Sequence, residues 1–157
     1  MHLKNHIASY NNLEKGVGGT LIIDTPNILR FYTPTDINLP PICQGLVQLR
    51  SYEAKEPTKH KSFQLFNVYF RPTSAKYTLF KQLAEAMAKA PSGLPTFLCG
   101  DLNFITSPED TSNPEPSPPS ATFLTAWGKV LERFDLYHPP QQEHTYFSLS
   151  TEAKQCY

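Results

Sequence analysis

The sequence of 157 residues has no excess of either charge, because 14 Lys and Arg residues balance 14 Asp and Glu residues. This balance excludes a protein that binds nucleic acid mainly through its net charge, although a local basic patch remains compatible with it. No apolar run approaches the roughly 18 to 20 residues that a membrane-spanning helix needs. An apolar segment typical of a secretory signal is also lacking. We therefore expect no membrane partner and an intracellular location, in the nucleus or the cytoplasm.

Cysteine is scarce as well, and the spacing of its three residues excludes two kinds of site. Cys43, Cys99 and Cys156 are odd in number and far apart, without a CxxC or a Cys/His pattern. Such spacing predicts neither a zinc site nor a disulfide framework. Reduced thiols are the expectation.

Proline, in contrast, is abundant, and it helps to divide the chain. The 15 prolines are roughly twice the average usage. Five of them fall within residues 106–120, where we predict an exposed loop with little regular structure. The length is that of one domain. We expect an N-terminal tail over residues 1–15 and one domain over residues 16–157 that contains the Pro-rich loop.

Hydrophobic patterns predict strands mixed with two helices. We expect strands over residues 17–24, 28–33, 45–53, 62–70, 95–100 and 144–150. The second would pair with the first, and 62–70 would be central because it is apolar on both faces. Apolar residues at helical spacing predict helices over 74–90 and 120–134, the latter with Ser120 as N-cap. Consecutive hairpin-like strands with crossover helices indicate an α+β or layered α/β fold.

A candidate site follows the strand predicted over 95–100, in the stretch Gly100-Asp101-Leu102-Asn103. Residues i and i+2 of an extended segment project to the same side. A carboxylate beside a carboxamide can align an attacking water and donate a hydrogen bond to a phosphoryl oxygen. Gly100 would allow the backbone to approach a ligand. The alternative is that Asp101 and Asn103 only end a strand and begin a turn.

This stretch also resembles a known family. "LCGDLNFITSPED" is similar to the GDxN signature of the endonuclease/exonuclease/phosphatase superfamily, which includes apurinic-site endonucleases, DNase I-like enzymes and retroelement endonucleases. "FNVYFRP" resembles the strand that precedes the signature in that family. "KGVGGTLII", "RFDLYHP" and "HTYFS" follow the order of the family's other segments. The resemblance covers nearly all of the chain from Gly16 to Ser150.

The resemblance implies a fold and a chemistry. The fold would be α+β, part of a DNase I-like four-layered α/β sandwich in which mixed, mostly antiparallel sheets are flanked by helices. The activity would be Mg²⁺-dependent hydrolysis of DNA or another phosphodiester. Asp101 would orient or deprotonate the attacking water, Asn103 would contact the scissile phosphate, and Tyr69 would hydrogen-bond a phosphate oxygen. Asn67 shares a strand face with Tyr69 and would support substrate binding.

Basic residues near the same strands suggest a backbone contact for nucleic acid. The candidate patch consists of Lys55, Lys59, His60, Lys61 and Arg71. Of these, Arg71 is the one that we expect to bind substrate together with Asn67. A solvated hairpin tip is the alternative for the residues of the 53–61 segment.

Two parts of the family pattern have no counterpart in the sequence. The family holds Mg²⁺ with a Glu on an early strand, and Glu14 lies too close to "GGTLII" to be that residue. The family also ends in an Asp-His pair, and none of the five histidines occupies its position: His2, His6, His60, His138 and His144. We therefore assign no metal ligand and expect a member truncated at both ends, with impaired hydrolysis.

Two other functions stay open at this point. The first is a catalytically inactive remnant that acts as a binding or structural module. The second is a phosphatase of the same superfamily that acts on a phosphorylated lipid or nucleotide.

Overall fold

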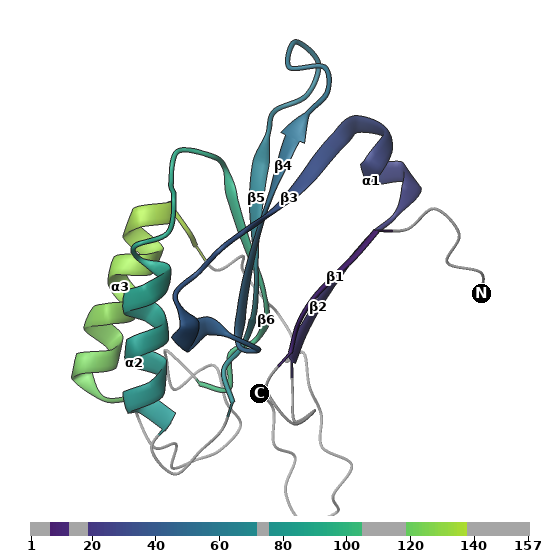
Figure 1. The fold of residues 1–157 in the computed structure, drawn as a ribbon. Helices are drawn as coiled ribbons and strands as arrows, with labels where there is room; N and C mark the ends of the chain where they lie inside the picture. Colours follow the sequence, from purple (N-terminus) through teal and green to yellow (C-terminus); the bar gives the residue numbers. More distant parts are fainter. Residues whose placement is uncertain (1–6, 13–18, 72–75, 105–118, 138–157) are drawn as a thin grey trace, which may run out of the picture.

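The fold is α+β and has three layers, as Figure 1 shows for the computed structural model. The structure describes residues 7–12, 19–71, 76–104 and 119–137. Two helices form one outer layer, a four-stranded sheet lies in the middle, and a two-stranded sheet forms the other outer layer. None of the helices among the described residues is long and apolar enough to span a membrane.

The large sheet has the strand order β3-β4-β5-β6. Its strands are β3 (Tyr32–Ile37), β4 (Val47–Ala54), β5 (Phe63–Tyr69) and β6 (Thr96–Asp101). The first three pair antiparallel, whereas β5 and β6 pair parallel, with helix α2 (Lys76–Met87) as the crossover. The prediction that the strand over 62–70 is central is confirmed, since β5 lies between β4 and β6.

The main core lies between the large sheet and the helices α2 and α3 (Ala121–Phe134). The sheet contributes alternate side chains such as Val47, Leu49, Phe66 and Val68, because only every second residue of a strand points to one face. Helix α3 buries the apolar face that its periodicity predicts, and this face consists of Phe123, Trp127, Val130 and Phe134. Both predicted helices are therefore confirmed.

The N-terminus of α3 is capped as predicted. The Ser120 hydroxyl accepts a hydrogen bond from the backbone N–H of Phe123 at 3.3 Å. We expect Ser120→Ala to lower the free energy of unfolding by about 1 kcal/mol, because this N–H loses its partner. Thr125→Ala is the control, since the exposed Thr125 hydroxyl only donates back to the carbonyl of Ala121 within the helix. Urea unfolding of both variants tests the difference, and equal midpoints would contradict it.

The partner predicted for the first strand is wrong. Strand β2 (Gly19–Asp24) pairs antiparallel with β1 (Ile7–Asn12), which lies inside the segment expected to be a tail. The strand predicted over 28–33 is wrong for residues 28–31, which belong to the short helix α1 (Pro26–Phe31). Pro26 is at the first helical turn, where a missing N–H costs no hydrogen bond, and the chain becomes extended again at Tyr32.

Two further predictions fall outside the described residues. They are the strand over 144–150 and all but the last two residues of the Pro-rich loop at 106–120. Between β3 and β4 the chain forms one turn of 3₁₀ helix, η2 (Pro41–Cys43). The two described residues of the predicted loop are residues 119 and 120, and the second of them is the N-cap Ser120.

Candidate functional site

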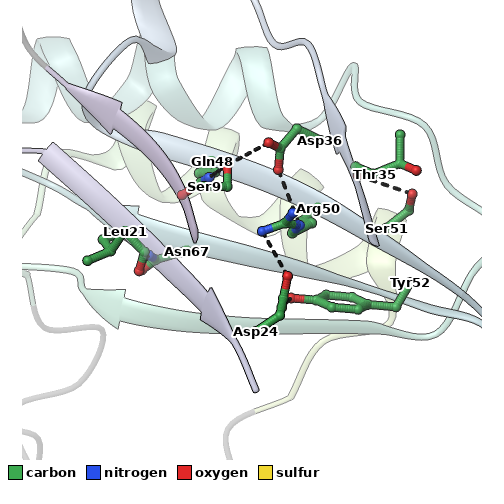
Figure 2. Close-up of polar contacts among 10 residues, drawn as sticks. All are labelled: Ser9, Leu21, Asp24, Thr35, Asp36, Gln48, Arg50, Ser51, Tyr52 and Asn67. Carbon is green, nitrogen blue, oxygen red and sulfur yellow. Dashed lines mark hydrogen bonds and ion pairs between the residues drawn. The ribbon is translucent and has the colours of Figure 1, made fainter. Parts of the chain in front are cut away.

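The parallel pair β5–β6 brings three predicted site residues to one face of the large sheet. Tyr69 on β5 is directly opposite Asp101 on β6, and Asn67 is opposite Cys99 two residues earlier. Residues in register on neighbouring strands project to the same face. This face is turned toward the small sheet, because the Asn67 side-chain amide donates to the carbonyl of Leu21 on β2 at 3.1 Å (Figure 2). The carboxyl ends of parallel strands are also where α/β proteins place ligands.

Asp101 and Asn103 are joined by a turn. Strand β6 ends at Asp101, and the backbone N–H of Asn103 donates to Asp101 Oδ1 at 3.2 Å. Asn103 has a φ of 49°, in the left-handed region that Asn tolerates better than most residues. The extended i, i+2 arrangement that we expected is therefore wrong for this pair. The turn that was the alternative interpretation is present, and it fixes one oxygen of the Asp101 carboxylate.

Gly100 is required by a close approach between two strands. Its φ is +126°, and a Cβ built on it would lie 1.9 Å from the carbonyl oxygen of Val68 on β5. The backbone N–H of Phe70 then donates to the carbonyl of Asp101 at 2.8 Å, which continues the pairing past the end of β5. The close neighbour of Gly100 is thus the β5 backbone, and the effect is to hold Asp101 beside Tyr69.

The five-residue basic patch predicted from sequence is wrong. Arg71 is exposed and follows the carboxyl end of β5, next to the candidate site. The other four residues lie in the connection that precedes β5, at its opposite end. Seven residues of strand separate the two ends by about 23 Å. Arg71 therefore lies at the end of the sheet that carries Tyr69 and Asp101, whereas the remaining basic residues belong to another surface.

The described residues contain no cluster of side chains that would by itself indicate a metal site. In the part of the chain that the structure describes, no group of three or more His, Cys, Asp or Glu side chains lies together. Mg²⁺ is usually bound through one or two carboxylates, waters and substrate phosphates. Asp101 alone offers a single carboxylate, so we derive no step through a metal. The expected Mg²⁺ dependence stays a prediction.

A charged cluster between the two sheets was not predicted from sequence; its Arg50 and Asp24 are buried, whereas Asp36 is half exposed (Figure 2). Arg50 on β4 lies 3.0 Å from Asp24 on β2 and 3.4 Å from Asp36 on β3, measured between side-chain nitrogen and oxygen atoms. The Tyr52 hydroxyl donates to the other oxygen of Asp24 at 2.6 Å. Burial is the main cause that raises the pKa of Tyr52 well above its ordinary value, and this hydrogen bond to a carboxylate raises the pKa further.

A hydrogen-bond chain joins this cluster to β1. The Gln48 side-chain amide donates to Ser9 Oγ, and Ser9 Oγ donates to the second oxygen of Asp36, both at 2.5 Å. One feature of the sequence did point to this cluster: Gln48, Arg50 and Tyr52 are alternate residues of one strand and therefore share a face. Their partners come from other strands, however, and no local spacing predicts those pairings. These contacts attach the small sheet to the large one.

The pocket beside this cluster does not include the candidate site. It has a volume of about 400 Å³ and lies between β1, the end of β3, η2 and the start of β4. Asn11, Asp36, Cys43 and Gln48 are among its lining residues. Burial raises the pKa of the Cys43 thiol to about 11, so this thiol is protonated at neutral pH. Tyr69, Asp101 and Asn103 do not line this pocket.

No protein-family model matches the chain, and the comparison with curated proteins finds no significantly similar sequence.

Proposed function

We propose that this chain acts on phosphodiesters as an endonuclease-like hydrolase with impaired activity. The observation that supports this function is the direct pairing of Tyr69 with Asp101 across the parallel strands β5 and β6. Asn103 and Arg71 follow the ends of the same two strands. The two helices, the large sheet and the small sheet would be part of a DNase I-like four-layered sandwich, as the resemblance to the endonuclease/exonuclease/phosphatase superfamily implies.

The arrangement divides the chemistry among three side chains. Asp101 Oδ1 accepts the N–H of Asn103, which orients the carboxylate and leaves Oδ2 to accept a proton from water. The water oxygen would attack phosphorus as the bond to the leaving oxygen breaks, and solvent would protonate that oxygen. The Tyr69 hydroxyl and the Asn103 carboxamide would donate to the phosphoryl oxygens. Donors held in place before the reaction stabilise the charge that develops there.

Asp101→Asn is expected to lower phosphodiester cleavage about 100-fold, because an amide cannot take the proton from water. The amide oxygen can still accept the N–H of Asn103, so the turn is retained. Asp135→Asn is the matched control, since Asp135 is exposed, has a φ of 50° and lies at the end of α3. Cleavage of nicked, abasic and single-stranded DNA with Mg²⁺ present measures the effect.

Two further variants separate the roles of the other groups. Tyr69→Phe removes only a hydroxyl, and Asn103→Gly removes the carboxamide while it keeps a left-handed backbone. Both are expected to weaken cleavage and leave the fold intact. The proposed hydrolytic activity would be overturned if the wild-type protein neither cleaved these substrates nor bound Mg²⁺. The second candidate function would then remain, which is a non-catalytic module that binds phosphodiesters. The presence of only one carboxylate at the described site favours this candidate.

A further inference from the structure

A row of aromatic rings crosses the large sheet at the end opposite the candidate site. It consists of Phe31, Tyr32, His60, Phe63 and Phe97, which we call the aromatic row. Neighbouring ring centroids are 4.9 Å apart for Phe31 and His60, and 6.0 Å for His60 and Tyr32. The spacing is 5.1 Å from Tyr32 to Phe63 and 5.6 Å from Phe63 to Phe97. Three stretches of the chain, at residues 31–32, 60–63 and 97, thus build one continuous aromatic surface.

The aromatic row lies on the face of the large sheet that the helices do not cover. Phe63 is in register with Tyr52, and the Tyr52 hydroxyl contacts Asp24 at the end of β2. The small sheet therefore ends beside the row. Phe97 is 59% exposed and Phe31 is 37% exposed. A contiguous patch of exposed aromatic side chains often indicates a binding surface.

Three basic residues lie near one end of the aromatic row, the end formed by Phe31 and His60. The Arg30 guanidinium lies 5.3 Å from the centroid of the Phe31 ring. Lys55 and Lys61 are exposed in the connection that also carries His60. Within the described chain none of these three cations has an ion pair, whereas Lys59 is paired with Glu56. The rim of the row thus keeps uncompensated positive charge.

We propose that the aromatic row binds single-stranded nucleic acid. Unpaired bases offer flat faces that stack on the exposed ring of Phe97, while Arg30, Lys55 and Lys61 contact the phosphates. An apolar peptide would not use the cations, and a duplex would not present its base faces. This surface is separated from Tyr69 and Asp101 by the length of β5, so the proposal is independent of the phosphodiesterase site.

The test is fluorescence anisotropy with a labelled oligothymidylate of 20 nucleotides, in EDTA so that no cleavage occurs. Phe97→Ala is expected to weaken binding at least tenfold, whereas Phe97→Tyr keeps a ring and should bind like the wild type. The three phosphate contacts predict a slope of about −2 for log K against log salt concentration. Arg30→Ala and Lys61→Ala should each reduce that slope.

Controls come from the exposed face of α3. Leu124→Ala removes an apolar side chain that is 36% exposed, and Lys129→Ala removes an exposed cation. Neither should change the affinity. Unaltered binding by Phe97→Ala, or the same loss of affinity in Leu124→Ala as in Phe97→Ala, would overturn the proposal. A second result would also overturn the proposal: the wild-type protein does not bind the oligonucleotide but sediments as a dimer, and Phe97→Ala dissociates that dimer. The aromatic row would then join two copies of the chain.

Discussion

Replacing Gly100 with alanine is expected to destabilise the protein by roughly 4 kcal/mol, or to prevent folding at 37 °C. Two costs combine at this position. The φ of +126° is strained for any residue with a side chain, and the new methyl group would lie 1.9 Å from the Val68 carbonyl oxygen. The oxygen belongs to backbone inside the central strand β5, so it cannot move without breaking the pairing with β4. Urea unfolding monitored by circular dichroism measures the loss.

Gly128→Ala is the matched control for this prediction. Gly128 lies in the exposed part of α3, and a Cβ there meets nothing within 4 Å. Alanine should therefore stabilise the protein, by about 1 kcal/mol. Opposite signs for the two substitutions are the expected result. A Gly100→Ala protein as stable as the wild type would show that β5 and β6 do not approach as closely as the structure indicates.

Gly100 also links stability to the candidate site. Because it allows β6 to lie close against β5, Asp101 comes into register with Tyr69. From the sequence we expected Gly100 to let the backbone approach a ligand, and the family resemblance supplied the roles of the residues around it. The neighbour that a side chain would meet is nevertheless a strand 32 residues earlier in the chain, from Val68 to Gly100. Local sequence patterns do not predict a contact between residues so far apart in the chain.

The parts of the fold that were predictable are those that local patterns determine. The apolar faces of α2 and α3 repeat at helical spacing, and the apolar residues on both faces of β5 match a strand between two neighbours. Strand β1 was missed because Ser9 and Asn11, the residues that it turns inward, are polar. They are half-buried or buried only because β3 and β4 supply their hydrogen-bond partners. Tertiary contacts, in this case, decided the local structure.

Arg50→Met is expected to cost about 3 to 5 kcal/mol, because it leaves the buried carboxylate of Asp24 without its positive partner. The side chains of Arg50 and Asp24 are 5% and 3% exposed, so solvent cannot replace the lost contact. Methionine fills a similar volume, and the loss therefore reports charge and not a cavity. Lys81→Met is the control, since its ion pair with Glu85 is exposed and 3.7 Å long. That substitution should change the stability by less than about 0.5 kcal/mol.

A double substitution shows whether the carboxylate is the cause. Asp24→Asn removes the unpaired charge and keeps an oxygen that can accept the Tyr52 hydroxyl. In the Arg50→Met background it should restore part of the stability, with a coupling energy of about 2 kcal/mol between the two sites. Additive effects would mean that the ion pair contributes little and that Arg50 acts through packing alone. Because Asp24 lies on β2 and Arg50 on β4, a positive coupling would also show that this pair attaches the small sheet to the large one.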